Sequence, residues 1–172
     1  MILTVGHSTH PIDEFLELLA AHGVEQLMDV RTIPKSRRNP QYNTEALAEA
    51  LQPAQIRYLH MPGLGGLRHP RKDSINSAWQ NDSFRGYADY MQTPAFAASL
   101  RELIDAAKQH RTVIMCAEAV PWRCHRSLIA DALLARGIQV ADILTTQPAK
   151  AHTLTSFARV DGEKVTYPGL LP

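Results

Sequence analysis

The sequence predicts an α/β fold of Rossmann-like type, in which a mainly parallel five-stranded sheet lies between two layers of helices. Short apolar runs alternate along the chain with amphipathic segments of helical period. The predicted strands are apolar along nearly their whole length, which is typical of a parallel sheet covered on both faces. Reactive side chains follow four of these strands, as expected where the carboxyl ends of parallel strands form one edge. We therefore expect a three-layer α/β/α domain with strand order 3-2-1-4-5.

The first half of the chain predicts three strands joined by helical or irregular segments. Residues 2–5 are a short apolar run, and the amphipathic pattern after it ends at Gly23, a residue typical of helix C-termini. A buried-strand pattern and a second helical pattern repeat this arrangement. The predicted elements are strand 2–5, helix 12–23, strand 25–31, helix 44–51 and strand 56–61.

The second half opens with a long irregular stretch, residues 62–83, and loops of that length are usually functional or mobile. Two helices are expected next, and Pro94 suits the first turn of the second one. A strand, a helix and a last strand then continue the alternation of strands and helices. The Asp161-Gly162 pair indicates a short hairpin. The predicted elements are helix 84–91, helix 94–110, strand 112–116, helix 126–136 and strand 138–144.

Size and composition fit one globular domain. The chain has 172 residues, 45% of them hydrophobic and 20% charged, so we expect a single domain, residues 1–172, in which residues 145–172 are a C-terminal extension. The net charge is only +1, but arginine and lysine crowd the second quarter of the chain, which predicts a local basic surface. The opening MILTVGHS has neither a basic leader nor a long apolar segment, so we expect a cytoplasmic protein without a membrane partner.

Reactive side chains are most concentrated in residues 112–137, which predict a strand, a loop and a helix. The start of a helix carries unpaired backbone N–H groups and a partial positive charge, which favour an anion or a thiolate. Such a segment at the edge of the sheet is typical of a site that holds an anion or a reactive thiolate. Its reactive residues are Cys116 at the strand end, Glu118 in the loop, and Cys124, His125 and Arg126 at the start of the helix.

Polar residues also follow the other predicted strands. His7 and Ser8 come after the first strand, Asp29 and Arg31 after the second, and His60 after the third. In the expected strand order the first and fourth strands are neighbours. Gly6-His7-Ser8 is therefore predicted to lie beside the cysteine loop.

Both cysteines have a chemical and a structural interpretation. Cys116 would face helix N–H groups and nearby arginines, which favours its thiolate, but cysteine is also among the most buried residue types. Cys124 is either the reactive thiol or a packing residue at the helix start. Two cysteines do not form a disulfide framework and a reducing compartment would keep them as thiols, although a bond between them is geometrically conceivable.

Arginine side chains are the expected anion ligands, because a guanidinium group forks onto phosphate or carboxylate oxygens. The alternative for two of them is a salt bridge with Asp29 or Glu118, and both interpretations can hold together. The predicted anion-binding residues are Arg31, Arg37, Arg126 and Ser8.

Acid–base chemistry is assigned to His7 and Glu118. His7 follows a glycine that allows close backbone approach, although it could simply bond across the loop. Glu118 beside arginines would normally stay ionised, which favours a structural role. Other predicted pocket residues are Asp29, His60, Cys124 and His125.

Metal and dinucleotide sites are not favoured. No pair among the cysteines and histidines has the short spacing typical of zinc, so no metal is expected, and the sequence names no cofactor. The glycines at 63–66 lack the full dinucleotide pattern. The basic segment 31–43, with Tyr42 at its end, would either track a nucleic-acid backbone or form a solvated surface.

Three separated stretches resemble domain-of-unknown-function family 488: GHST, DVRTIPKSRRNPQYN and MCAEAVPWRCHRSLIADALLARG. The similarity extends to about Leu144. The resemblance implies a small bacterial or archaeal α/β domain, sometimes labelled as related to DNA repair, without an established reaction.

The layout LMDVR, VIMC and RSLIADALLARGIQVADIL is also similar to that of rhodanese-like sulfurtransferases. The loop itself differs. Six residues separate Cys116 from Arg123, where related cysteine phosphatases have five, and the usual glycines are replaced by Ala-Val-Pro-Trp. Pro121 has no N–H to offer an oxyanion.

Three functional hypotheses follow. The leading one is that the carboxyl edge of the sheet binds a phosphate-bearing ligand, either a nucleotide or a nucleic acid. The second is an enzyme that transfers sulfur or a phosphoryl group through a Cys116 thiolate. The third is a non-enzymatic nucleic-acid-binding module that uses the segment from Arg31 to Lys72. The sequence does not fix the substrate or the oligomeric state.

Overall fold

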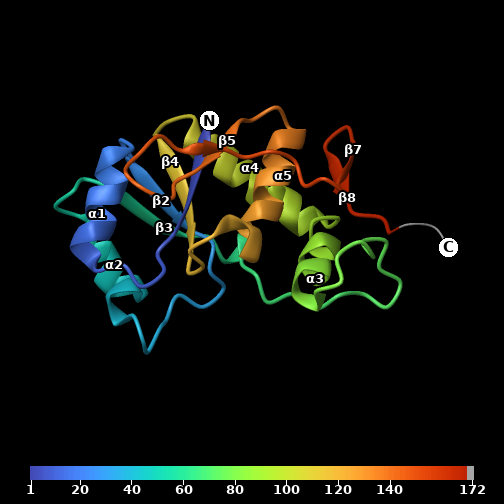
Figure 1. The fold of residues 1–172 in the computed structure, drawn as a ribbon, viewed down its shortest axis with the longest axis horizontal. Coiled ribbons are helices and arrows are strands. Elements are labelled where there is room, and N and C mark those ends of the chain that lie inside the picture. The colour runs from blue at the N-terminus through green and yellow to red at the C-terminus, as the bar shows by residue number, and fades with distance from the viewer. Residues whose placement is uncertain (170–172) are drawn as a thin grey trace.

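A computed structural model describes residues 1–169, and its centre is a six-stranded sheet in the order β3-β2-β4-β1-β5-β6 (Figure 1). The first five strands in this order run parallel, and β6 is antiparallel to β5. The strands are β1 (Ile2–Gly6), β2 (Gln26–Asp29), β3 (Arg57–His60), β4 (Thr112–Cys116), β5 (Val140–Asp142) and β6 (Lys150–Ala151).

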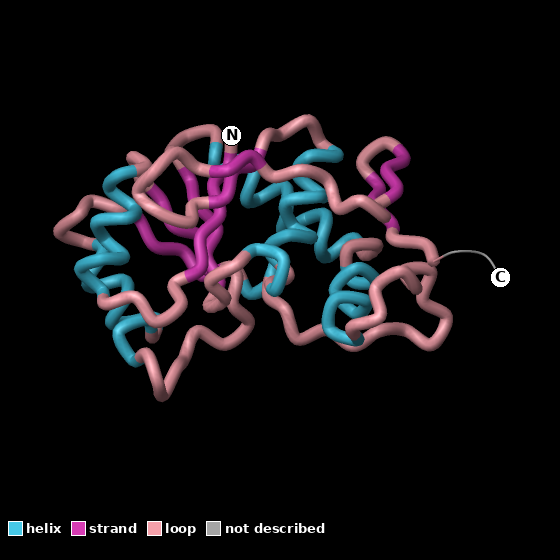
Figure 2. The backbone as a smooth tube through the Cα atoms, viewed as in Figure 1, coloured by secondary structure: helices cyan, strands magenta, loops and turns pink. Residues whose placement is uncertain are grey.

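Helices lie on both faces of this sheet, so the predicted three-layer α/β/α class is confirmed (Figures 1 and 2). They are α1 (Ile12–Ala21), α2 (Thr44–Leu51), α3 (Asp82–Tyr90), α4 (Pro94–Ala107) and α5 (Arg126–Ala135). Three 3-10 helices that the sequence analysis did not predict are η1 (Pro40–Tyr42), η2 (Pro62–Leu64) and η3 (Pro121–Arg123).

The predicted order 3-2-1-4-5 is wrong in its middle two strands. β4 lies between β2 and β1, where it pairs with both: Val113 is opposite Leu27 on one side and Leu3 on the other. The long connection through α3 and α4 brings the chain back past β2 before β4 begins. Both orders make β1 and β4 neighbours, and the pairing of Gly6 with Cys116 confirms that the loop after β1 lies beside the cysteine loop.

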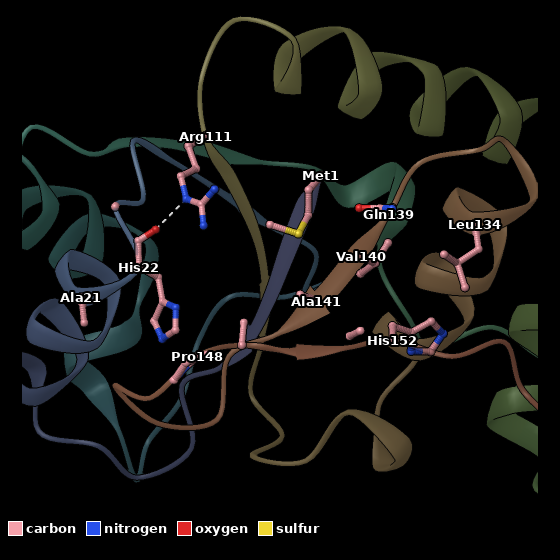
Figure 3. A pocket seen from close by; sticks show the side chains of 13 residues that line it. Met1, Ala21, His22, Arg111, Leu134, Gln139, Val140, Ala141, Pro148 and His152 are labelled. Carbon is pink, nitrogen blue, oxygen red and sulfur yellow. Dashed lines mark hydrogen bonds between the residues drawn. The ribbon is translucent and has the colours of Figure 1, made fainter.

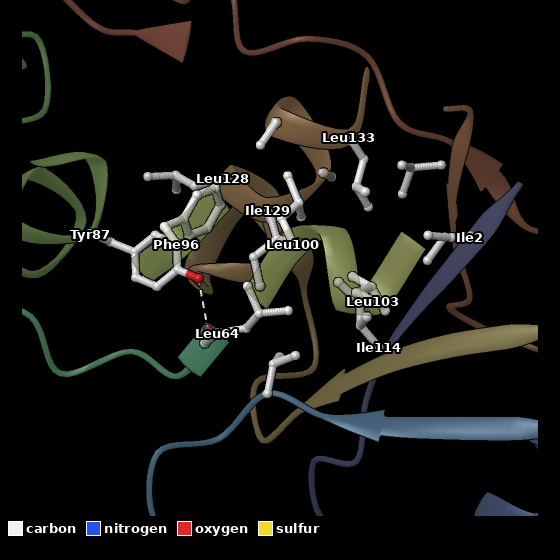
Figure 4. Close-up of a cluster of buried hydrophobic side chains, with 14 of the residues drawn as sticks. Ile2, Leu64, Tyr87, Phe96, Leu100, Leu103, Ile114, Leu128, Ile129 and Leu133 are labelled. Atoms are coloured by element: carbon white, nitrogen blue, oxygen red, sulfur yellow. Dashed lines mark hydrogen bonds between the residues drawn. The ribbon is translucent and has the colours of Figure 1, made fainter. Parts of the chain in front are cut away.

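Two hydrophobic clusters hold the layers together. On one face, Phe15 of α1 and Leu47 of α2 pack with side chains of β1, β2 and β4. On the other face, Leu100 of α4 and Leu128 and Ile129 of α5 belong to a cluster that includes Ile114 of β4 (Figure 4). β4 contributes to both clusters, which explains why all five of its residues are buried.

The long loop before α3 is ordered by one buried carboxylate. Asp89 of α3 accepts hydrogen bonds from the Ser74 hydroxyl, the Asn76 amide and the Arg71 backbone N–H, at 2.6, 2.8 and 2.8 Å. Tyr87 donates a hydrogen bond to the carbonyl of Leu64 at 2.8 Å. These contacts fix the loop against α3, on the side of the sheet where α4 and α5 lie (Figure 1).

The C-terminal segment packs onto α5. Asp131 is fully buried in α5 and accepts hydrogen bonds from the Tyr167 hydroxyl at 2.7 Å, the Thr155 N–H at 3.1 Å and the His152 ring at 2.9 Å. The predicted hairpin is confirmed as β7 (Arg159–Asp161) and β8 (Lys164–Thr166), whereas β6 was not predicted. Residues 170–172 of the expected extension lie outside the described residues.

Among residues 1–169, every helix is too short or too polar to span a membrane.

Candidate functional site

A cleft of about 760 Å³ opens at the carboxyl ends of β1, β2 and β4. The loops after these strands form its wall, and residues just before α5, part of the loop before α3 and part of α3 itself complete it. Seven of the predicted site residues line this cleft: His7, Ser8, Arg31, Cys116, Glu118, Cys124 and His125. Asp29, His60, Arg37 and Arg126 do not line it.

Cys116 ends β4 and lies in the wall of the cleft, with 2% of its surface exposed. Arg126 Nη1 donates a hydrogen bond to Cys116 Sγ at 2.7 Å. Gly6, opposite Cys116 in the sheet, lets the cysteine loop approach closely, because a Cβ at this position would collide with the carbonyl of Glu118. The sheet register and this glycine therefore place the thiol against the guanidinium group.

Arg126 is fully buried at the first turn of α5. Besides the thiol, it donates to the carbonyl oxygens of Glu118 and Ala119 at 2.6 and 3.2 Å and to the Thr4 hydroxyl at 3.3 Å. A ligand phosphate would have to displace these acceptors. Anion binding by Arg126 stays a prediction; in this fold its side chain meets the Cys116 sulfur, the Thr4 hydroxyl and the carbonyls of the cysteine loop.

The two cysteines have opposite pKa shifts. Burial raises the pKa of Cys116, but a hydrogen bond from the Cys124 thiol and the charge of Arg126 lower it more, to about 7. Burial and the neighbouring Cys116 sulfur raise the pKa of Cys124 well above its ordinary value. Both are free cysteines. Cys116 is thus the thiolate of the pair and Cys124 the protonated partner.

His125 follows Cys124 and contacts its sulfur, with Nδ1 3.6 Å from Cys124 Sγ. The other ring nitrogen, Nε2, is 2.9 Å from the carbonyl oxygen of Val30, so Nε2 carries the proton and donates it. Burial lowers the pKa of His125 to about 4. The ring is therefore neutral near pH 7, and the lone pair of Nδ1 faces the Cys124 thiol.

His7 is held in a comparable way on the opposite wall. Its Nδ1 is 2.8 Å from the carbonyl oxygen of Ser8, and Arg31 Nη1 is 3.3 Å from its Nε2. The ring stacks on Tyr42 with centroids 4.1 Å apart, and burial lowers the pKa of His7 to about 4. His7 is thus neutral near pH 7, with Nδ1 as the donor and Nε2 as the acceptor.

Arg31 forms the salt bridge that the sequence analysis gave as an alternative. Its Nε and Nη2 donate to the two carboxylate oxygens of Asp29 at 2.9 and 2.7 Å, and Tyr58 also donates to that carboxylate at 2.6 Å. Asp29 is fully buried and so belongs to the scaffold of the site. Arg31 keeps one edge toward the cleft through the Nη1 atom that faces His7.

The remaining predicted residues divide between the cleft and its surroundings. Glu118 is exposed at the cleft, and Ser8 adopts a positive φ of 47°, a conformation rare outside glycine. His60 lies behind the wall, with Nε2 2.7 Å from the carbonyl oxygen of Arg31. Arg37 is exposed on the loop beyond the cleft.

A comparison with protein-family models places these motifs in a known group. The family described as Domain of unknown function DUF488 matches residues 11–133. The chain belongs to this family. Searches of curated proteins and of solved structures found no match. The matched region of this DUF488 chain contains both cysteines, His125, Arg126 and the basic loop, whereas His7 and Ser8 precede it.

Sequence reasoning missed several residues of the cleft. Lys35 and Arg123 are exposed at its edge, and Gly66 approaches His125 so closely that a Cβ would lie 3.2 Å from Nδ1. Tyr42, expected near a nucleic-acid surface, is fully buried under His7, and its hydroxyl donates to the carbonyl oxygen of His10 at 2.6 Å. The two cations were visible in the sequence as charges within predicted loops, but only the fold shows that they line the same cleft as Cys116.

A second pocket, of about 660 Å³, lies at the opposite ends of the strands (Figure 3). Its polar groups are engaged within the chain: Arg111 Nε donates to the carbonyl of His22 at 2.6 Å, and His22 Nε2 lies 2.7 Å from the carbonyl of Thr145. The carboxyl-edge cleft combines a cysteine of lowered pKa with the exposed cations Lys35 and Arg123 and is therefore the better candidate site.

Within residues 1–169, no three histidine, cysteine, aspartate or glutamate side chains come together in a way that would hold a metal ion.

Proposed function

We propose that this DUF488 chain is a cysteine-dependent enzyme that takes sulfane sulfur from a small anionic donor onto Cys116. One observation supports the proposal above all others: Arg126 Nη1 lies 2.7 Å from Cys116 Sγ, at the end of a strand and in the wall of a cleft. A buried cation in contact with a thiol favours the thiolate, which is the nucleophilic form.

The edge of the cleft favours an anionic substrate. Lys35 and Arg123 are exposed there, and Arg31 adds one partly committed guanidinium edge, against a single carboxylate at Glu118. Cations around a recess attract anions and orient them before reaction. We therefore assign the binding of the anionic substrate to Lys35 and Arg123, whereas the sequence predicted Arg126 and Arg37 for this role.

Sulfur transfer fits the loop better than phosphoryl transfer. A transferred phosphoryl group needs donors for three oxygens, but the loop turns the carbonyls of Glu118 and Ala119 toward Arg126. The N–H groups of Arg123 and Cys124 bond back to Val120 and Pro121 within the turn. A sulfane sulfur is a single-atom electrophile and needs no such cradle.

The reaction balances without a further reactant. The Cys116 thiolate attacks the outer sulfur of the donor, the S–S bond of the donor breaks, and the leaving group departs with the electron pair. Cys116 then carries a persulfide. With thiosulfate as the donor, the leaving group is sulfite.

The test measures the sulfite that is released when an excess of thiosulfate is mixed with the wild-type protein or with its Cys116→Ser variant, and the thiolate released from an excess of glutathione persulfide in parallel. We expect about one leaving group per chain from the wild type and none above background from Cys116→Ser with at least one donor. Equal release from both proteins with both donors would refute the proposal.

A phosphate-bearing ligand is a second candidate, favoured by exposed Lys35, Arg37 and Arg38 on the loop beside the cleft. A nucleotide would place its phosphate between Lys35 and Arg123, and a nucleic acid would continue along this loop. Binding of a single-stranded oligonucleotide should weaken with salt and weaken further in Arg37→Ala/Arg38→Ala. Arg159→Ala, a substitution at an exposed arginine of β7, is the control. Salt-insensitive binding, or equal binding by all three proteins, would exclude this candidate.

A further inference from the structure

We propose that Cys124 is a resolving thiol, which attacks the sulfurated Cys116 to form an intramolecular disulfide and release hydrosulfide, with His125 as the base. This inference rests on the proposed sulfur transfer to Cys116, and it adds the reaction step that follows sulfur uptake. It predicts a product, hydrosulfide, and a requirement for an external dithiol that reduces the disulfide and restores the site.

The first argument is the arrangement of the two sulfurs around Arg126. Its side-chain Nη1 donates to Cys116 Sγ at 2.7 Å, while its backbone N–H, at the start of α5, donates to Cys124 Sγ at 3.4 Å. Both cysteines also line the carboxyl-edge cleft. The loop between the cysteines thus returns the chain to the strand end and brings both sulfurs to the same cleft and the same arginine.

The second argument is the tautomer of His125. Because the Nε2–H group donates a hydrogen bond to the carbonyl of Val30, Nδ1 carries the lone pair, and it lies 3.6 Å from Cys124 Sγ. A base within reach of a thiol is the arrangement that activates a cysteine nucleophile. Tyr87 packs against the ring, with centroids 4.9 Å apart, and Gly66 leaves room for Nδ1. These neighbours hold the imidazole in this orientation.

The third argument is electrostatic and sets the order of events. In the resting site, negative charge on Cys116 disfavours ionisation of Cys124. Formation of the Cys116 persulfide moves that charge one atom away, to the outer sulfur. Loss of the Cys124 proton to His125 during the attack is then less disfavoured, so resolution follows sulfur uptake and does not compete with it.

The resolving step balances in atoms and electrons. Cys124 Sγ, its proton transferred to His125 Nδ1, attacks the inner sulfur of the Cys116 persulfide, and the new S–S bond joins the two cysteines. The bond to the outer sulfur breaks, and that sulfur keeps the electron pair, takes up the proton from His125 and leaves as hydrosulfide. The Cys124 sulfur is oxidised from the thiol to the disulfide level, the outer sulfur is reduced to hydrosulfide, and the Cys116 sulfur keeps its oxidation state.

The experiment follows the mass of the intact chain after a sulfane donor is added to wild type, Cys124→Ser and Cys116→Ser. In the wild type we expect loss of two hydrogens, which marks the disulfide, together with one equivalent of hydrosulfide. In Cys124→Ser we expect a gain of one sulfur and no hydrosulfide. Cys116→Ser should show neither change. A wild type that keeps the added sulfur as a stable persulfide would overturn the inference.

The design separates failure of this inference from failure of the proposed function. If no protein gains sulfur or releases the leaving group of the donor, sulfur transfer is wrong and the inference falls with it. If Cys124→Ser gains sulfur but the wild type forms no disulfide, sulfur transfer stands and only the resolving role is lost.

The role of His125 has its own readout. In His125→Asn, disulfide formation at pH 7 should be at least tenfold slower than in the wild type and should approach the wild-type rate as the pH rises toward the pKa of Cys124. A base is needed only while the thiol is protonated. A rate that is unchanged, or that is lowered equally at every pH, would assign His125 a structural role only.

Discussion

Replacement of Arg126 by methionine tests whether the buried guanidinium supports both the cysteine loop and the thiolate. The variant keeps an unbranched chain of similar length but removes every donor. The carbonyl oxygens of Glu118 and Ala119 lose their partners, at 2.6 and 3.2 Å. A buried acceptor without a partner costs about 1–3 kcal/mol, but these two carbonyls are only part-buried and water can reach them, so we expect the free energy of unfolding to fall by about 1–3 kcal/mol in total. That is a large part of the roughly 5–15 kcal/mol that stabilises a typical domain.

The same substitution acts on the chemistry of Cys116. Without Arg126 the burial of the thiol is no longer offset by a cation, so the pKa of Cys116 should rise from about 7 to at least the ordinary value near 8.5. Urea unfolding measures the stability, and alkylation rate against pH measures the pKa. Arg126→Lys keeps the charge and is the variant to use for the pKa if Arg126→Met does not fold.

Arg101→Met is the matched control, because Arg101 is an exposed arginine of α4. Its unfolding free energy should change by no more than about 0.5 kcal/mol, as for most surface substitutions. The reasoning would be refuted if Arg126→Met were as stable as Arg101→Met and kept the wild-type pH profile of Cys116.

Three further predictions concern the scaffold. The Gly6→Ala variant should unfold at a lower urea concentration than the wild type and should show a slower rate of Cys116 alkylation, because the new Cβ collides with the cysteine loop. A wild-type urea midpoint together with a wild-type alkylation rate would contradict this prediction. Asp131→Ala should lose about 3–5 kcal/mol of unfolding free energy, because the buried Tyr167 hydroxyl and the part-buried donors of His152 and Thr155 lose their acceptor. The exposed Asp105→Ala should change little, and equal urea midpoints for the two variants would disprove the prediction. His7 and His125 have a pKa of about 4 in the fold and 6.5 when unfolded, so the unfolded chain binds more protons between these values. Stability should therefore fall as pH drops from 6.5 to 4, by up to about 1.4 kcal/mol per pH unit for each histidine. His7→Gln should flatten that slope, and an unchanged slope would count against the assignment.

The sequence predicted the elements of this fold well because each carries a local signal. The alternation of apolar runs with helical patterns located every parallel strand and all five α-helices, and the Asp161-Gly162 pair marked the hairpin. Strand order is not a local property. A connection as long as the one from β3 to β4 can return to either side of β1, so the pattern alone did not place β4 between β2 and β1.

The location of the site was predictable, because the parallel strands determine which residues reach the same edge of the sheet. Parallel strands deliver His7, Arg31 and Cys116 to one edge in either strand order. The partners of each side chain were not predictable, because burial decides them. The sequence predicted Arg126 as an anion ligand, but its full burial gives it the thiol and the loop carbonyls as partners, and Lys35 and Arg123 are the exposed cations at the cleft.

The central claim is that Cys116 is the reactive thiolate and Cys124 its protonated partner. Iodoacetamide labelling of each cysteine across pH 5–10, read by mass spectrometry of the separated peptides, tests it directly. The account predicts that Cys116 labels with a midpoint near pH 7 and that Cys124 resists labelling until well above the ordinary thiol pKa of about 8.5. If Cys124 labels first, or if Cys116 stays unlabelled until the chain unfolds, the assignment is contradicted.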